Sequence, residues 1–197
     1  MKRTPVVGVL ALQGDFAEHA ALLRSLDAAP REVRTAAQLA GADALIIPGG
    51  ESTTMATLMD IFDLRGPITD FARSGRPLWG TCAGMILLAD RLVEPAPEPL
   101  RLMDILVHRN AFGRQVDSFE TDIDFAGIDG GPLHAVFIRA PWVAEVGPQV
   151  EVLAALDNGA VVAVRQANLL ATAFHPELTP DPRAHAYFLE MARVAAA

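Results

Sequence analysis

The sequence predicts an α/β fold of three layers, in which helices cover both faces of a mostly parallel central sheet that also carries strand-rich insertions. Over residues 6–92, short apolar runs alternate with amphipathic stretches, and this βαβα order is typical of parallel sheets. After a proline-rich connection at 95–99, short strands are separated by Gly-Pro and Asn-Gly pairs, which favour antiparallel turns. The length of 197 residues suits a single domain over 1–197.

The first half of the chain contains the alternating elements. Apolar runs there predict strands, and the stretches between them have the residue spacing of helices. In chain order we expect a strand at 6–12, a helix at 16–26, a weak strand at 31–35, a strand at 44–47, helices at 53–61 and 67–74, a strand at 77–80 and a helix at 83–92. Ser52 or Thr53 is available as the N-cap of the helix at 53–61.

The second half of the chain is richer in strands. We expect them at 104–108, 118–124, 133–138, 150–156 and 160–166, with turns at 131–132, 147–148 and 158–159. The apolar run at 169–174 then returns to the main sheet. Asp181 and Pro182 are suited to be the N-cap and the first residue of a closing helix.

Composition excludes several classes of function. A formal net charge of −8 at pH 7 argues against a nucleic-acid-binding surface, which would be basic. No apolar run reaches the roughly 18 residues of a membrane span, and the first residues lack a signal-peptide pattern. One cysteine allows no internal disulfide, as expected in a reducing cytoplasm. The five histidines and this cysteine lack metal-ligand spacing, so no metal site is expected.

The single cysteine, Cys82, lies in a Gly-Thr-Cys-Ala-Gly segment at 80–84, between the expected strand and helix. Gly-x-Cys-x-Gly is the cysteine form of the nucleophile elbow, a turn too tight for bulky neighbours. The following helix N-terminus supplies N–H groups for an oxyanion and favours a thiolate. A buried structural cysteine is the alternative at this stage.

A histidine and a glutamate follow the last expected strand. Pro176 disfavours a helical conformation for His175, so the strand is expected to stay extended through the histidine. In an extended chain, His175 and Glu177 would point to the same side. Glu177 could then accept from one imidazole nitrogen while the other faces the thiol of Cys82, as in a nucleophile, base and orienting-group triad.

Two adjacent glycines, Gly49 and Gly50, follow the strand at 44–47. They allow the backbone to approach a ligand closely and to direct an N–H at it. Glu51 is then placed to hold a substrate cation. The alternative is a plain strand-to-helix turn; the segment is neither a P-loop nor a dinucleotide fingerprint.

Three segments, in this order, resemble class I (triad) glutamine amidotransferases: Pro-Gly-Gly-Glu-Ser at 48–52, Gly-Thr-Cys-Ala-Gly at 80–84 and Phe-His-Pro-Glu at 174–177. More narrowly, the segments 10–14, 109–120 and 137–141 are similar to those of the glutaminase subunits of pyridoxal 5′-phosphate synthases. The similarity extends over essentially the whole chain. It departs at His108, where an acidic residue is expected, and in the segment 94–101. The resemblance implies a flavodoxin-like fold.

The expected reaction is hydrolysis of L-glutamine to L-glutamate and ammonia through a thioester on Cys82. His175 would act as general base and general acid, and Glu177 would orient the imidazole of His175. The N–H groups of Gly50 and Ala83 would stabilise the oxyanion.

The resemblance implies a set of substrate contacts: Gly50, Glu51, Ser52, Arg109, Ile138 and Arg139. Glu51 is a candidate for the α-ammonium of glutamine, and Arg109 and Arg139 are candidates for its α-carboxylate. Gln13 is expected to contact the oxyanion loop or a partner interface.

The ammonia needs an acceptor, and the glutaminase takes up the whole chain. The resemblance implies a separate, barrel-shaped synthase subunit in a hetero-oligomeric complex, which combines ammonia with a pentose phosphate and a triose phosphate. Pyridoxal 5′-phosphate is then a product of the complex, and no cofactor is expected on this chain.

Three alternatives remain. An amidotransferase subunit of another pathway, such as histidine biosynthesis, shares the chemistry, but the segment 109–120 argues against it. A cysteine hydrolase or redox-responsive chaperone would not need the 50–51 loop together with His-Pro-Glu. A catalytically silent binding subunit would not need a complete triad.

Overall fold

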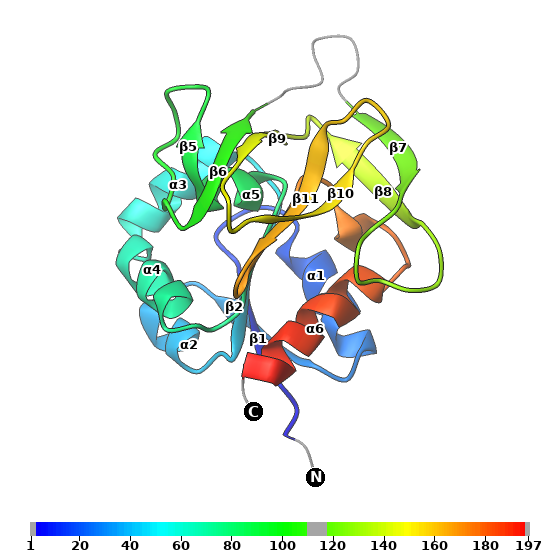
Figure 1. The fold of residues 1–197 in the computed structure, drawn as a ribbon. Helices are drawn as coiled ribbons and strands as arrows, with labels where there is room; N and C mark the ends of the chain where they lie inside the picture. Colours follow the sequence, from blue (N-terminus) through cyan, green and yellow to red (C-terminus); the bar gives the residue numbers. More distant parts are fainter. Residues whose placement is uncertain (1–2, 110–117, 196–197) are drawn as a thin grey trace.

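The architecture is a central β-sheet with helices on both faces (Figure 1). The computed structural model describes residues 3–109 and 118–195. The strands are β1 (Val6–Leu10), β2 (Ala29–Val33), β3 (Ala44–Ile47), β4 (Leu78–Thr81), β5 (Ala89–Leu92), β6 (Met103–His108), β7 (Ser118–Ile123), β8 (Leu133–Ile138), β9 (Trp142–Val146), β10 (Glu151–Ala155), β11 (Val161–Gln166) and β12 (Leu169–Thr172).

The helices occupy two sides of this sheet. They are α1 (Phe16–Ser25), α2 (Ala36–Ala40), α3 (Ser52–Ile61), α4 (Arg65–Arg73), α5 (Ala83–Leu88), the 3-10 helix η1 (Pro176–Leu178) and α6 (Arg183–Ala195). Figure 1 shows α2, α3 and α4 on one side and α1 and α6 on the other. The expected three-layer α/β architecture is confirmed. Within the described residues, no helix has the length and apolar character needed to span a bilayer.

Strand order brings distant parts of the chain to one edge. The main sheet runs β2-β1-β3-β4-β12-β11-β9-β6-β5, β10 also pairs with β11, and β7 pairs with β8 in a second sheet. The neighbours β1, β3, β4 and β12 are mutually parallel. Their carboxyl ends therefore lie along the same edge, where the loops after residues 10, 47, 81 and 172 meet.

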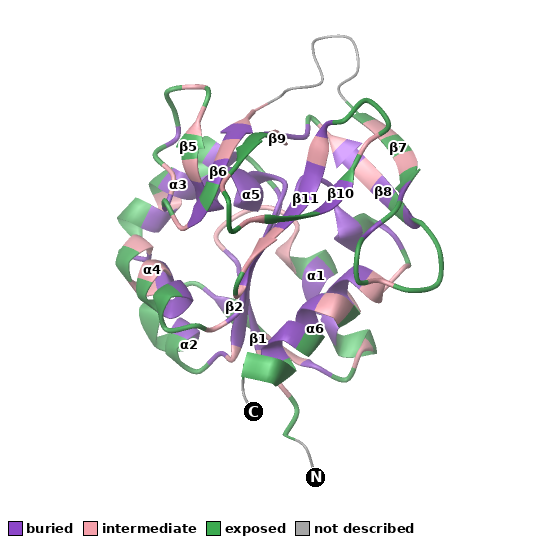
Figure 2. Ribbon diagram, viewed as in Figure 1, coloured by how far each residue is buried: buried purple, intermediate pink, exposed green. Residues whose placement is uncertain are grey.

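The core is apolar on both faces of the sheet. All four residues of β3 are buried, and so are all four of β4 and of β12. Such continuous burial is typical of parallel strands covered on both faces. In Figure 2, purple is concentrated in the interior of the molecule, and the outer helix α2 is largely green. Trp79 of β4 is fully buried, and its indole N–H donates to Thr172 Oγ1 over 3.1 Å. This bond ties β4 to β12 directly beneath the site.

Several element predictions were wrong in detail. The expected helix at 83–92 ends at Leu88, because residues 89–92 pair with β6 instead, a tertiary contact that overrides local helix propensity. Strand β9 was not expected, and the second strand begins at residue 29, not 31. The turn at 147–148 joins β9 to β10, which both pair with β11, so it is no hairpin. The closing helix begins at Arg183, one residue after Pro182.

Candidate active site

Cys82 occupies a sharp turn between β4 and α5. Its φ of +48° and ψ of −103° lie where a non-glycine residue is rarely found, and its backbone N–H donates to Thr172 O over 2.8 Å. A Cβ on Gly80 would lie 2.4 Å from the carbonyl carbon of Gly84, and one on Gly84 would lie 2.2 Å from Ile47 O. Neither glycine position can carry a side chain. The elbow is strained and closely packed, and it holds a buried sulfur at the sheet edge.

His175 follows β12 and is anchored through its backbone, whose N–H donates to Val136 O over 2.8 Å. Its Nδ1 lies 2.7 Å from Glu177 Oε1, and both side chains are buried. Burial alone would lower the pKa of His175, but hydrogen bonds to the Cys82 sulfur and to Glu177, together with their charges, raise it to about 10. At neutral pH the imidazole of His175 is therefore protonated and positively charged.

The backbone at this histidine differs from the expectation of an extended chain. Strand β12 ends at Thr172, and Glu177 lies in the 3-10 helix η1, which begins at Pro176. Alternation along a strand is therefore the wrong reason for the contact between His175 and Glu177; the helical turn brings the carboxylate back to the imidazole. Burial raises the pKa of Glu177, although its hydrogen bond to His175 acts in the opposite direction.

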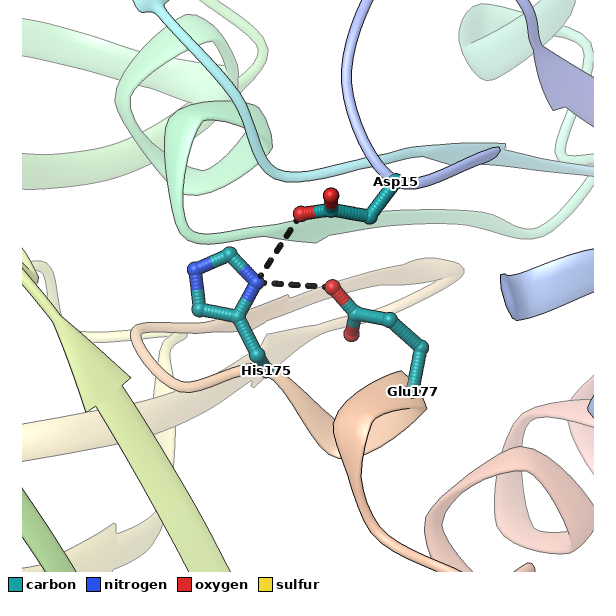
Figure 3. A group of neighbouring side chains, drawn as sticks. All are labelled: Asp15, His175 and Glu177. Atoms are coloured by element: carbon teal, nitrogen blue, oxygen red, sulfur yellow. Dashed lines mark hydrogen bonds and ion pairs between the residues drawn. The ribbon is translucent and has the colours of Figure 1, made fainter. Parts of the chain in front are cut away.

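Asp15 is a second carboxylate at the same imidazole nitrogen. Its Oδ2 lies 3.4 Å from His175 Nδ1, so Asp15 and Glu177 approach this atom from two different segments (Figure 3). Asp15 was not among the residues predicted from the sequence. Its position just after the first parallel strand was the available signal, since loops at that end of the sheet converge.

The double-glycine loop packs against both the histidine and the loop after β1. A Cβ on Gly49 would lie 2.3 Å from His175 Cε1, so only glycine allows the imidazole to sit there. Gly50 has φ +148°, and a Cβ on it would lie 2.0 Å from Gln13 Nε2. Gln13 also accepts from Glu51 N over 3.0 Å. Gln13 thus contacts the loop in which the sequence placed an oxyanion donor.

Glu51 is the N-cap of α3, a position expected for Ser52 or Thr53. Its carboxylate accepts from Thr53 N at 2.9 Å and Thr54 N at 2.6 Å. Partial burial would raise the pKa of Glu51, but these hydrogen bonds lower it to about 2. Ser52 is instead the first residue of the helix and is buried. Glu51 therefore stays ionised, with a fixed orientation, at the edge of the site.

Arg109 lies beside Glu51, with Nη2 3.7 Å from Glu51 Oε1. Its guanidinium also donates to the carbonyl of Ala96, and its backbone N–H donates to Glu94 Oε2 over 3.0 Å. The structure thus joins two of the expected substrate contacts, Glu51 and Arg109, as an ion pair. Within the segment 109–120 that carries the narrower resemblance, residues 110–117 lie outside the described residues.

The last three expected residues flank the elbow. Ile138 O lies 4.0 Å from Cys82 Sγ, and Arg139 has φ +43°, a strained value for a long side chain. Ala83 is the first residue of α5. N–H groups in the first turn of a helix have no acceptor within that helix, so the N–H of Ala83 is available to a ligand.

Comparison with known proteins gives one consistent result. A model of the SNO glutamine amidotransferase family matches residues 9–194. The chain is 58% identical over 193 residues to a protein of Acidothermus cellulolyticus named pyridoxal 5′-phosphate synthase subunit PdxT, covering 95% of this chain and 93% of that one. The protein of the same name from Streptomyces griseus is 53% identical over 195 residues, covering 98% of each chain.

A solved structure described as a glutamine amidotransferase has the same fold. It superimposes with a TM-score of 0.88 at 50% sequence identity, covering 94% of this chain and 98% of that one.

Proposed function

The chain belongs to the SNO glutamine amidotransferase family, and we propose that it is the glutaminase subunit of a pyridoxal 5′-phosphate synthase. The observation that carries the proposal is the buried hydrogen bond between His175 and Glu177 at the sheet edge where Cys82 occupies a strained elbow. The substrate is L-glutamine, and one glutaminase domain spans 1–197.

The first chemical step is attack by Cys82 on the carboxamide of glutamine. His175 already holds the proton of the thiol, and the sulfur forms a bond to the δ-carbon while the carbonyl electrons move to oxygen. Glu177 stabilises the imidazolium that results. The N–H groups of Ala83 and Gly50 stabilise the oxyanion. Removal of one such donor typically lowers the rate by about 10²–10³-fold.

Collapse of this intermediate releases ammonia. The C–N bond breaks, His175 gives its proton to the departing nitrogen, and a thioester remains on Cys82. Water then attacks the thioester with His175 as base, which releases L-glutamate and restores the thiol. A raised pKa of His175 suits the first half of this cycle, because the imidazole must hold a proton until ammonia departs.

Substrate binding uses the charged groups around the elbow. Glu51 holds the α-ammonium, and Arg109 and Arg139 hold the α-carboxylate or order the pocket, with Gly50, Ser52 and Ile138 completing the contacts. The fixed, ionised carboxylate of Glu51 supports its role. The ion pair of Glu51 with Arg109 matches the opposite charges of an amino acid zwitterion.

A separate synthase subunit receives the ammonia in a hetero-oligomeric complex, with no role for nucleic acid, a membrane or a bound cofactor. The single cysteine is suited to a reducing compartment such as the cytoplasm. A subunit serving histidine biosynthesis is the rival within the same chemistry, and the names of the relatives favour the pyridoxal phosphate pathway.

Isotope transfer tests this function. The chain, its synthase partner, the two sugar phosphates and glutamine labelled with ¹⁵N in the carboxamide should yield pyridoxal 5′-phosphate with ¹⁵N in its ring. Unlabelled product, or label transferred only to an acceptor of another pathway, would contradict the proposal.

A further inference from the structure

Three fully buried polar side chains form a group that reaches the second oxygen of Glu177 through one of its members, His19. They are His19 on α1, His185 on α6 and Thr81 on β4, each with no exposed surface. The proposed chemistry uses none of them. Buried histidines are costly unless their ring nitrogens are satisfied, so the arrangement calls for an explanation.

The three groups form a chain that ends at the triad. His19 Nε2 lies 3.3 Å from Glu177 Oε2 and 3.3 Å from Thr81 Oγ1, while His19 Nδ1 lies 2.9 Å from His185 Nε2. The approach to Glu177 Oε2 is not aligned as a hydrogen bond, and this oxygen has no hydrogen-bonded partner among the described residues. A buried carboxylate oxygen needs a donor, and an N–H at His19 Nε2 can supply one to Glu177 Oε2.

The contacts decide which nitrogens carry protons. His185 Nδ1 has no hydrogen-bond partner within the described chain. With a proton on Nδ1 of both rings, His185 would bury an N–H without an acceptor, and His19 would turn a lone pair towards Glu177. With the proton on Nε2 of both rings, His185 donates to His19, and His19 donates towards Glu177 and Thr81. The second arrangement avoids both penalties.

Both histidines remain neutral in this arrangement. Burial lowers the pKa of His19 well below its usual value, with the neighbouring His185 and His175 acting in the same direction, and burial lowers the pKa of His185 to about 3. Trp79 packs edge-on against both rings, with centroid distances of 5.9 and 5.0 Å. The rings are thus held in place without adding a second buried charge beside Glu177.

We propose that His19 is a positioning residue that holds Oε2 of Glu177, and that His185 fixes the tautomer of His19 for this task. Glu177 is then held from both sides, by His175 at Oε1 and by His19 at Oε2. The inference rests on the proposed function, because it acts through the orienting carboxylate of the triad. It extends the triad inward to α1 and α6.

Substitutions at position 19 separate donation from packing. His19→Leu fills a similar volume without a donor, whereas the amide of His19→Gln can place an N–H near the former Nε2. With saturating synthase subunit, we expect His19→Leu to lower kcat about 10-fold, as the loss of one charge-assisted hydrogen bond would. His19→Gln should recover most of this loss. Thermal unfolding of each variant confirms that it is folded.

A double-mutant cycle with Glu177→Ala gives the decisive kinetic result. If His19 acts through Glu177, His19→Leu has no further effect on kcat once the carboxylate is removed. An equal loss in both backgrounds would overturn this proposal alone. Normal activity of Glu177→Ala by itself would instead overturn the orienting role in the proposed function and this proposal with it.

The pH profile provides an independent readout. The groups facing Glu177 are His175, Asp15 and His19. Without the His19 donor the pKa of Glu177 rises further, so the acid limb of kcat should move to higher pH in His19→Leu and stay in place in His19→Gln. A structural role alone would lower kcat without moving the limb, and that result would contradict the proposal.

The tautomers can be read in the unmodified protein. Long-range ¹H–¹⁵N spectra of the chain, which has five histidines, should show His19 and His185 neutral between pH 6 and 8, each protonated on Nε2. Assignment uses the spectra of His19→Gln and His185→Gln. A proton on Nδ1 of His19 would overturn the proposal, whatever the kinetic effect of the variants.

Discussion

The side chains of His175 and Glu177 meet over 2.7 Å because the chain turns into a 3-10 helix directly after the histidine. Pro176 begins this helix, and its first turn returns the carboxylate to the imidazole. Both side chains are buried, which strengthens the hydrogen bond between them and makes the loss of either partner costly.

Truncating the two residues should have unequal effects. Both variants should have a lower kcat/KM than the native chain. We expect the fold-loss in Glu177→Ala to be about 10 to 100 times smaller than that in His175→Ala, because orienting a base matters less than supplying one. Steady-state ammonia release with saturating synthase subunit measures both. When either substitution is combined with Cys82→Ala, kcat/KM should fall little further. Native activity in Glu177→Ala would show that another group orients His175.

Titration of His175 should reveal its coupling to the sulfur. We expect a pKa of about 10 in the native chain and a lower pKa in Cys82→Ala, where the hydrogen bond and charge of the sulfur are lost. ¹⁵N spectra against pH measure it. Since this pKa lies above the unfolded value of about 6.5, the stability it contributes is complete below pH 6.5 and is lost as pH rises through about 10. An unchanged pKa in Cys82→Ala would contradict the contact.

Gly49→Ala should impair catalysis through His175. The added Cβ would lie 2.3 Å from His175 Cε1, so the ring must move. A misplacement of about 1 Å can cost about 10²-fold in rate. Gly66→Ala is the matched control, because no atom lies within 4 Å of a Cβ there. It should leave kcat unchanged and stabilise α4 by up to about 1 kcal/mol. Equal activities of the two variants would contradict the packing.

The sequence predicted the parts of the site that local rules govern. The strands at 44–47 and 77–80 are apolar runs with glycine at or close after their ends, and the elbow at 80–84 requires small residues on both sides of Cys82. These features depend on a few consecutive residues. They were therefore accessible without knowledge of the tertiary structure.

The features that the sequence missed depend on tertiary contacts. Residues 89–92 form a strand because β6 lies beside them. The N-cap of α3 is the exception, because Glu51 replaces Ser52 there through a local contact of its carboxylate with the N–H groups of Thr53 and Thr54. Asp15 lies just before an amphipathic helix and His19 lies within it, and no local pattern relates either residue to a glutamate more than 150 residues later.

The glutaminase should be regulated by its partner. The Gly49–Gly50 peptide is flexible enough to adopt two orientations, and only one directs an N–H at the oxyanion. We expect weak activity of the isolated chain and a rise of about 10²–10³-fold when the synthase subunit docks at this edge, the effect of one oxyanion donor. A titration of kcat/KM for glutamine with the partner measures it. Full activity of the isolated chain would favour a permanently formed oxyanion hole.

Ammonia release by Cys82→Ala tests directly whether Cys82 is the nucleophile. We expect the partner-saturated variant to be folded, to bind the synthase subunit and to release no ammonia from glutamine above the uncatalysed rate. In the native chain, an electrophilic glutamine analogue should label Cys82, the one cysteine of the sequence. Ammonia release at the native rate by a folded Cys82→Ala variant would contradict the assignment of Cys82 as the nucleophile.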